Sequence, residues 1–233
     1  MIYSGADKVF KSVKRGENPF AISPDFGKDN LEWQRQASGF DENGNAATDA
    51  SGGITRDATG AEENATIVVM SESTIRAGLV FAGTDDGKVE MTRNDGGSWE
   101  NIGGHFPGAP AVIHVSSIDP SHADSATIYV TLDNHRENDF KPYVYVTNDW
   151  GKTWRSINSN LPTGGVPAST YVVREDLVNP NLLYVGTETG VFASLNKKYN
   201  ADTVTQDDID LLTNTLDRWQ LVKDDFDSVI ASV

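Results

Sequence analysis

Five acidic residues stand where a pair of carboxylates could cleave a glycosidic bond. That reaction needs two acids about 5 to 9.5 Å apart in a cleft, one acting as acid and the other as base or nucleophile. The sequence places these acids beside runs of apolar residues, where strands are expected to end. Acids at such places also serve as ordinary turn residues. The candidates are Asp85, Asp86, Glu175, Asp176 and Glu188.

A second stretch, "DENGNAATD" (41–49), carries oxygen ligands at alternating positions, as calcium loops often do. It lacks the glycine at the sixth place and the glutamate at the twelfth that complete an EF-hand loop. A solvated loop rich in Gly, Asn and Asp explains the same composition. We therefore expect no cofactor, with calcium as the alternative, held by Asp41, Asn43, Asn45 and Asp49.

The remaining chemistry-bearing residues give little support to a catalytic centre. The chain has no cysteine, which excludes disulfides, thiol catalysis and Cys-based zinc sites. Its four histidines, at 105, 114, 122 and 135, show no metal-type spacing. His114 lies within an apolar run and is expected in the core.

The charge balance bears on the choice of partner. The 233 residues carry 19 basic and 34 acidic side chains, a formal net charge of −15. This charge repels phosphate backbones and anionic lipids, so we expect no nucleic-acid partner. No apolar run approaches the ~18 residues of a membrane span, so we expect no membrane insertion. The N-terminus lacks the basic and apolar regions of a signal peptide.

Internal repeats organise the chain. The stretches 79–102 and 127–157 each read as an apolar strand, a polar turn, an alternating strand and an Asp-Gly turn ending in Trp. A third copy, 182–196, matches the first nearly residue for residue, and an eroded fourth copy opens the chain at 2–22. Further apolar segments lie at 65–73, 111–119 and 169–177. About four short strands per unit, with a periodic Gly/aromatic motif, predict β-propeller blades.

The stretch "TNDWGKTW" (147–154) is the clearest copy of the turn. Gly151 supplies a backbone conformation that a β-carbon would penalise, and the Asp149 carboxylate can accept backbone N–H groups. Trp154 begins the next strand and can lay its ring against the neighbouring blade. We interpret the motif as architectural, with a ligand contact at Asp149 as the alternative.

This motif resembles the Asp box, S/T-x-D-x-G-x-T-W, of bacterial neuraminidase repeats (BNR). The stretch "TRNDGGSW" (92–99) fits less well: Asn94 falls at the Asp place when aligned on Trp99, while Asp95-Gly96-Gly97 suggests a deleted residue. With its neighbouring segments the chain resembles large sortilin-like, BNR-containing bacterial proteins often labelled as glycosyl hydrolases. The residues that carry the motif are Thr147, Asp149, Gly151, Thr153, Trp154, Asp95, Gly96 and Trp99.

The predicted fold is all-β: about 3.5 to 4 blades of a partial propeller with four-stranded antiparallel blades, followed by a C-terminal helix. We expect a partial blade at 1–23, a long loop at 24–64, blades at 65–104 and 110–160, an incomplete blade at 168–196 and a divergent tail at 197–233. Apolar residues at helical spacing between Ile209 and Val229 favour the helix. The alternative makes "RWQLV" (218–222) the missing fourth strand after an insertion.

Two functions follow from this resemblance. The first is a non-catalytic interaction module whose blades bind a protein, peptide or glycan partner, as sortilin-type propellers do. The second is a fragment of a BNR-repeat glycoside hydrolase acting on an extracellular polysaccharide. Against a sialidase, Arg76, Arg93, Arg136 and Arg174 lie outside the matching motifs. The resemblance also implies a secreted or periplasmic location within a longer parent protein. Uncovered terminal blades predict self-association.

Overall fold

The structure is a computed structural model of the chain, and it describes residues 1–26, 66–159, 161–163, 167–195 and 220–221. Within these ranges the regular structure consists of antiparallel strands and one short 3-10 helix, η2 (His135–Glu137). The calcium candidates at 41–49 and most of the expected loop at 24–64 lie outside the described residues, so both stay predictions.

The strands form four separate sheets, one after another along the chain. The first sheet contains β1 (Ile2–Gly5), β2 (Val9–Ser12) and β3 (Phe20–Ala21). The second contains β4 (Ile67–Glu72), β5 (Val80–Thr84), β6 (Val89–Thr92) and β7 (Glu100–Asn101). The third contains β8 (His114–Pro120), β9 (Ile128–Asn134), β10 (Asp139–Thr147) and β11 (Arg155–Ser156). The fourth contains β12 (Thr170–Glu175), β13 (Leu182–Thr187), β14 (Gly190–Leu195) and β15 (Gln220–Leu221).

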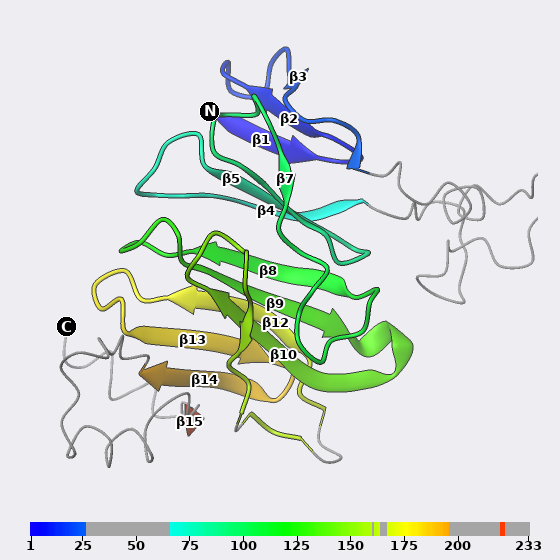
Figure 1. The fold of residues 1–233 in the computed structure, drawn as a ribbon, viewed down its shortest axis with the longest axis vertical. Helices are drawn as coiled ribbons and strands as arrows, with labels where there is room; N and C mark the ends of the chain where they lie inside the picture. Colours follow the sequence, from blue (N-terminus) through cyan, green and yellow to red (C-terminus); the bar gives the residue numbers. More distant parts are fainter. Residues whose placement is uncertain (27–65, 160, 164–166, 196–219, 222–233) are drawn as a thin grey trace, which may run out of the picture.

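The sheets are stacked face to face in chain order, from β1–β3 at the top of Figure 1 to β12–β15 at the bottom. In each four-stranded sheet the order in space follows the order in sequence, and every neighbouring pair is antiparallel. The first strands β4, β8 and β12 contact one another from sheet to sheet. Radial repetition of such four-stranded meanders is the architecture of a β-propeller. The predicted all-β, partial propeller is therefore confirmed.

The registers show that three of the sheets are built on one plan. Each first strand carries an irregularity at the same place, between Ile67 and Val69, Val115 and Ser117, and Thr170 and Val172. Because one extra residue is inserted there, the first strand bends at that point. Because the bulge lies at the same place in each sheet, it serves as a common reference point from which equivalent residues of the three sheets can be matched.

Apolar cores fill the spaces between successive sheets. The largest joins the second and third sheets around Phe81, Val115 and Trp154, all nearly inaccessible to solvent. Another joins the third and fourth around Tyr129, Val173 and Val185, and a smaller one joins the first and second around Val9, Ile67 and Ala82. Strands in such a stack are covered on both faces, so β5 and β9 are buried at every residue instead of alternating.

The C-terminal prediction needs a correction at two residues. Gln220 and Leu221 form β15, which pairs with Ala193 and Phe192 of β14. The favoured helix would have run through these residues, and there the alternative, a fourth strand within "RWQLV", holds. Backbone N–H and C=O groups on the free edge of β14 explain why a strand adds there. The rest of the tail lies outside the described residues.

Candidate functional site

The propeller has two ends, and they differ in composition. At one end, on the right in Figure 1, β5, β9 and β13 finish and β4, β8 and β12 begin. We call this the acid end, defined by Asp85, Asp133 and Glu188 and the turns that carry them. The opposite end carries the turns at 92–99 and 147–154, and we call it the turn end.

The three defining acids occupy equivalent positions in three consecutive sheets. Thr84 pairs with Ile67, Leu132 with Val115, and Thr187 with Thr170, and in each case the next residue is the acid. The strand register therefore places one carboxylate per sheet at the acid end. The backbone repeats as well, since the N–H groups of Asp85 and Glu188 donate to the carbonyls of Thr66 and Ser169, both at 3.1 Å.

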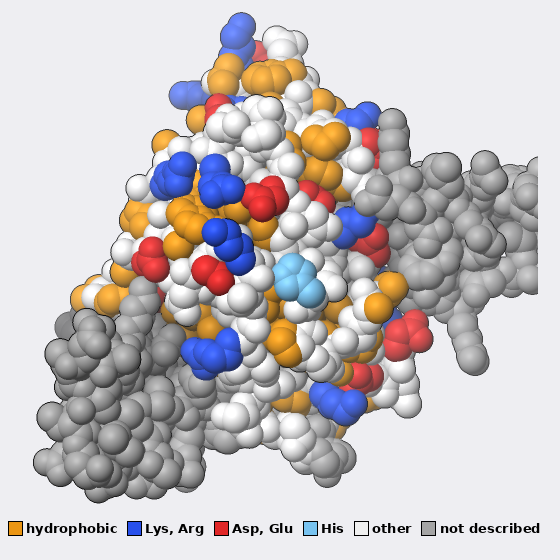
Figure 2. Space-filling model, viewed as in Figure 1, with side chains coloured by type: hydrophobic (Ala, Val, Ile, Leu, Met, Phe, Trp, Pro, Cys, Tyr) orange, Lys and Arg blue, Asp and Glu red, His pale blue; other side chains and the backbone are white. Residues whose placement is uncertain are grey.

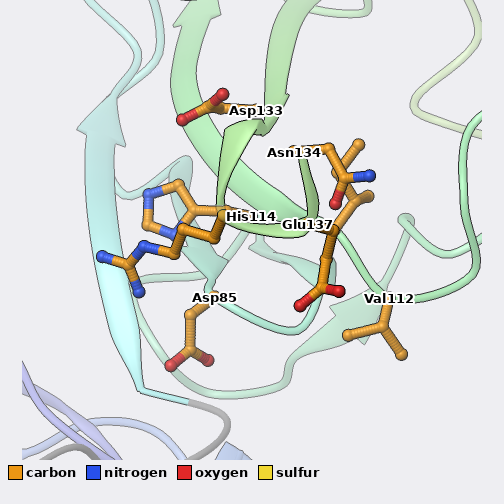
Figure 3. Close-up of a pocket in the computed structure, with 8 residues that line it drawn as sticks. Asp85, Val112, His114, Asp133, Asn134 and Glu137 are labelled. Carbon is orange, nitrogen blue, oxygen red and sulfur yellow. The ribbon is translucent and has the colours of Figure 1, made fainter. Parts of the chain in front are cut away.

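A small hollow opens at this end between the second and third sheets (Figure 3). Its volume is about 40 Å³, which holds a few water molecules but does not enclose a sugar ring. A larger ligand would therefore lie across the mouth instead of entering. The hollow is lined by Asp85, Val112, Ile113, His114, Asp133, Asn134, Arg136 and Glu137.

His114 sits in the wall of this hollow, between Asp133 and Asp85 in the view of Figure 3. Burial lowers its pKa, the positive charge of Arg136 lowers it further, and the Asp133 carboxylate acts in the opposite direction. Among the described residues, its buried Nδ1 has no hydrogen-bond partner. His114 was expected in the core, but it lies at the edge of the core, facing a polar hollow.

Asp133 and Asp139 lie on either side of the turn that joins β9 to β10, and hydrogen bonds hold both carboxylates. Asp133 accepts the backbone N–H of His135 at 3.1 Å and pairs with the His135 ring. Asp139 accepts the Tyr143 hydroxyl at 2.7 Å. Burial alone would raise the pKa of Asp139, but its hydrogen bonds, chiefly from Tyr143, outweigh burial and hold the pKa below its usual value. The carboxylate of Asp139 is therefore anionic at neutral pH.

An exposed aromatic residue lies beside these acids. Tyr171 is the bulge residue of β12 and is 42% exposed. Its ring centroid lies 6.5 Å from that of His135, edge to face. Burial raises the pKa of Tyr171, and the carboxylates of Glu188 and Asp133 raise it further because they disfavour a phenolate. Exposed Phe140 and Val112 add to the apolar surface at the same end.

At the turn end, the stretch 147–154 closes on itself through side-chain hydrogen bonds. The Asp149 carboxylate accepts the Thr147 hydroxyl at 2.7 Å and both the N–H and the hydroxyl of Thr153, at 2.9 and 2.6 Å. These bonds, chiefly those from Thr153, lower the pKa of Asp149 to about 2. The Gly151 N–H donates to Thr147 Oγ1 at 2.9 Å. All the hydrogen bonds described here for the Asp149 carboxylate are made within the turn.

The turn at 92–99 has the same length and repeats three of these hydrogen bonds, which corrects the expected deletion. Asn94 Oδ1 accepts the Thr92 hydroxyl at 3.0 Å and the Ser98 N–H at 2.9 Å, and Gly96 N–H donates to Thr92 Oγ1. Asn94 therefore takes the place of Asp149. Asp95, assigned to the motif from sequence, instead receives the buried Lys11 ammonium at 2.5 to 2.6 Å.

Both turns dock on the preceding sheet in one way. The Trp154 indole N–H donates to the Ile102 carbonyl, and the Trp99 indole N–H donates to the Ile22 carbonyl, each at 2.7 Å. The glycines touch the same residues: a β-carbon on Gly151 would lie 2.5 Å from Ile102 Cβ, and one on Gly96 would lie 2.5 Å from the Ile22 carbonyl oxygen. The turns therefore hold the second sheet against the first and the third sheet against the second.

The five acids considered for catalysis do not gather in one cleft. Glu175 and Asp176 lie at the turn end, whereas Asp85, Asp86 and Glu188 lie at the acid end. Glu175 is buried and accepts the Ser121 hydroxyl and the His122 N–H, and Asp176 caps its own turn through the N–H groups of residues 178 and 179. Asp86 bonds the Thr84 hydroxyl. Of the five, Asp85 alone lines the hollow, and it accepts the Thr66 N–H at 3.0 Å.

The four arginines considered for a sugar carboxylate are also dispersed. The guanidinium groups of Arg76 and Arg93 lie 5.3 and 5.4 Å from the ring centroid of Trp150, at the turn end. Arg174 donates to Ser117 Oγ at 2.9 Å, and Arg136 lines the hollow. On the face seen in Figure 2, acidic and basic side chains are interspersed with hydrophobic ones. No arginine triad forms among the described residues.

The described residues lack two further features. Within the described ranges, no group of three or more His, Asp or Glu side chains is arranged to hold a metal ion. The part of the chain that the structure describes contains no helix long and apolar enough to cross a membrane.

Sequence reasoning missed the acid end as a unit. The resemblance drew attention to the turns. His135 was considered only as a metal ligand, and Asp133, Glu137 and Tyr171 were not considered. The signal that could have found them is the position directly after Thr84, Leu132 and Thr187, which is acidic in all three four-stranded sheets. Recognising this signal requires the pairing of β8 with β9. The longer connection between β9 and β10 hides that pairing in the sequence.

Several solved structures are similar to this chain in fold but distant in sequence. The GH74 xyloglucanase Xcc1752 from Xanthomonas campestris is 17% identical, and the match covers 87% of this chain and 28% of that one with a TM-score of 0.53. YCF48 from Cyanidioschyzon merolae matches at 17% identity, over 73% of this chain and 44% of that one, with a TM-score of 0.46. A GH74 enzyme from Niastella koreensis matches at 16% identity, over 62% and 24%, with a TM-score of 0.45.

These likenesses concern the fold. At 17% identity the likeness to the xyloglucanase supports a shared propeller architecture and nothing about activity. The other two matches have TM-scores below 0.5 and support no conclusion about this chain. The chain spans less than a third of the length of the xyloglucanase that it matches. Comparison with protein-family models finds no match, and comparison with curated proteins finds none either.

Proposed function

We propose that the chain is a non-catalytic interaction module that binds a protein or peptide segment at its acid end. The observation that carries the proposal is the placement of Tyr171, which is 42% exposed and whose ring lies edge to face with that of His135, the partner of Asp133. Glu188 lies on the same turn region, since its N–H donates to the carbonyl of Ser169, two residues before Tyr171. Anionic groups beside an exposed aromatic ring fit a ligand that presents Lys or Arg next to an apolar side chain. The net charge of −15 attracts such a ligand at long range.

The hydrogen-bonded turns support the more specific assignment to Asp-box, BNR-type repeats. Two consecutive turns share the acceptor at the third place, the glycine at the fifth and the docking Trp at the eighth. In this assignment the turns are scaffold and the ligand site lies at the other end. The sortilin-like relationship, glycan binding and a secreted or periplasmic location stay predictions.

The second candidate, a fragment of a glycoside hydrolase, rests on the carboxylates of Asp85, Asp133 and Glu137 in the hollow. Against it, Asp85 and Asp133 each accept backbone N–H groups, and the cavity does not admit a sugar ring. Carboxylates that serve as turn acceptors are poor candidates for the proton transfers of glycoside cleavage.

The test uses two pools of fluorescent octapeptides, one combining Lys or Arg with Leu or Phe, the other combining Asp or Glu with the same apolar residues. Fluorescence polarisation should show saturable binding of the basic pool alone. Tyr171→Ala should weaken this binding at least tenfold. The matched control is Val178→Ala, which removes a 92% exposed apolar side chain at the turn end and should leave binding unchanged.

Reducing-sugar release from a polysaccharide panel that includes xyloglucan separates the two candidates. The proposal predicts no turnover. Turnover that disappears in Asp85→Asn would establish the hydrolase instead. Equal loss of peptide binding in Tyr171→Ala and Val178→Ala would show that the ligand does not bind at the acid end.

A further inference from the structure

One face of the first sheet is left uncovered by the described residues. Ile2 of β1 is 48% exposed and Ser4 is exposed, while Phe10 of β2, which pairs with Ser4, is half-buried. Because opposed residues in an antiparallel pair share a face, Ile2 and Phe10 lie on one surface together with Ser4 and with Ser12, which pairs with Ile2. We call it the leading face, since it points away from the rest of the chain's sheets.

The positions equivalent to Ile2 and Ser4 are buried in the other sheets. The register makes Val80, Ile128 and Leu183 equivalent to Ile2, and these three are 1%, 0% and 1% exposed. The positions equivalent to Ser4 are Ala82, Val130 and Val185, all at 0%. In each of these sheets the leading face packs against the sheet before it in the chain, within one of the three apolar cores.

The fourth sheet has the complementary uncovered face. An aromatic residue occupies one equivalent position in every sheet, and in the first three it contacts the core shared with the following sheet: Tyr3, Phe81 and Tyr129. In the fourth sheet the equivalent residue is Tyr184, which is half-buried, and Val191 on the same face is 46% exposed. We call this surface the trailing face.

We propose that the leading face of one chain packs on the trailing face of a second copy of the same chain, and that two such contacts close a ring. Every contact between sheets within the chain joins a trailing face to the leading face of the next sheet. The two faces left over are one of each kind, so they fit each other as continuations of the same stack. Two copies of the four described sheets make a ring of eight, in which the three-stranded first sheet of each copy meets the four-stranded fourth sheet of the other. Eight is at the upper end of the four to eight blades of closed propellers.

Closure by a second copy also covers the apolar side chains that the open stack exposes to water. The exposed parts of Ile2 and Val191 would be buried, and burial of apolar surface favours association. A two-fold ring with identical contacts stops at two chains, whereas a contact whose rotation does not close produces filaments. The net charge of −15 on each copy opposes association, so salt should favour the ring.

The test is the molar mass in solution by light scattering and sedimentation velocity over a concentration series. The ring predicts a species of twice the chain mass of 25.3 kDa and no larger one, strengthened by added salt. Ile2→Lys and Tyr184→Lys should each lower the dimer's apparent affinity at least a hundredfold. The matched control Val178→Lys places the same charge at an exposed site on neither face and should leave the dimer intact.

Mixing the two variants keeps the proposal falsifiable if either one is merely less stable. A mixture of Ile2→Lys and Tyr184→Lys chains contains one contact free of both substitutions, so mixed dimers should form where neither variant dimerises alone. A wild-type chain of 25.3 kDa at all concentrations would overturn the proposal, as would masses beyond two chains or a dimer that withstands Ile2→Lys. This outcome is independent of peptide binding, because neither face includes Tyr171.

Discussion

Asp149 and Asn94 accept equivalent hydrogen bonds in two consecutive turns, although only Asp149 carries a charge. Both accept the hydroxyl of a Thr two residues earlier and an N–H four residues later. Asn94 Nδ2 also donates to Ser98 Oγ at 3.0 Å, where Asp149 instead accepts the Thr153 hydroxyl. The turn therefore needs an oxygen acceptor at this place and not a carboxylate as such.

This equivalence predicts the pH dependence of stability. The folded pKa of Asp149, about 2, lies below its ordinary 3.8, so its carboxylate stabilises the native state above pH 3.8 and loses that effect as the pH falls toward 2. Asp149→Asn should keep the turn but remove this dependence. The difference in melting temperature between wild type and variant should therefore shrink between pH 5 and pH 2.

The reciprocal change provides the control. Asn94→Asp places a carboxylate in the same set of hydrogen bonds and should gain stability at pH 5 that is lost toward pH 2. Melting curves followed by circular dichroism measure both variants at each pH. If the melting temperature of each variant differs from that of the wild type by the same amount at every pH, the role assigned to the Asp149 carboxylate is contradicted.

At the scale of elements, the turn glycines combine two constraints. Gly151 has φ +78° and its β-carbon would collide with Ile102, whereas Gly108 has φ +77° and nothing within 4 Å. Gly108→Ala should therefore cost about 1 to 2 kcal/mol, the penalty for a left-handed backbone. Gly151→Ala should cost about 1 to 3 kcal/mol more, because the added methyl overpacks the contact between sheets. Urea unfolding of the two variants measures the difference, and equal costs would contradict the docking geometry.

The elements were largely predictable, and the exceptions have physical causes. Alternating apolar runs and repeat alignment identified the strands, because the register of each sheet repeats. The strand at Gln220–Leu221 is only two residues long, too short for alternation to show, so the spacing of neighbouring apolar residues favoured a helix instead. The roles of Asn94 and Asp95 depended on hydrogen bonds, which residue type alone does not reveal.

At the scale of the molecule, the two ends of the stack divide structure from proposed recognition. The turn end holds the sheets together through Trp99 and Trp154, and the acid end presents carboxylates with Tyr171. The acid end was not predictable from sequence, because it is assembled from residues about 50 apart whose equivalence emerges from strand register. The hollow likewise depends on two sheets meeting.

Long-range charge should affect binding of the basic peptide pool. With a net charge of −15, association with cationic peptides should weaken as salt rises, since the Debye length falls from about 10 Å at 0.1 M to about 3 Å at 1 M. Polarisation titrations at several salt concentrations measure this dependence. Salt-independent affinity would indicate that the aromatic and apolar contacts act alone.

Hydrogen exchange by mass spectrometry, with and without the basic peptide pool, tests the central claim most directly. We predict that the pool protects amides at 133–140, 168–174 and 187–191, around Tyr171, and leaves those at 92–99, 147–154 and 176–181 unchanged. Protection confined to the turn end, with none around Tyr171, would contradict the division of the molecule into a scaffold end and a binding end.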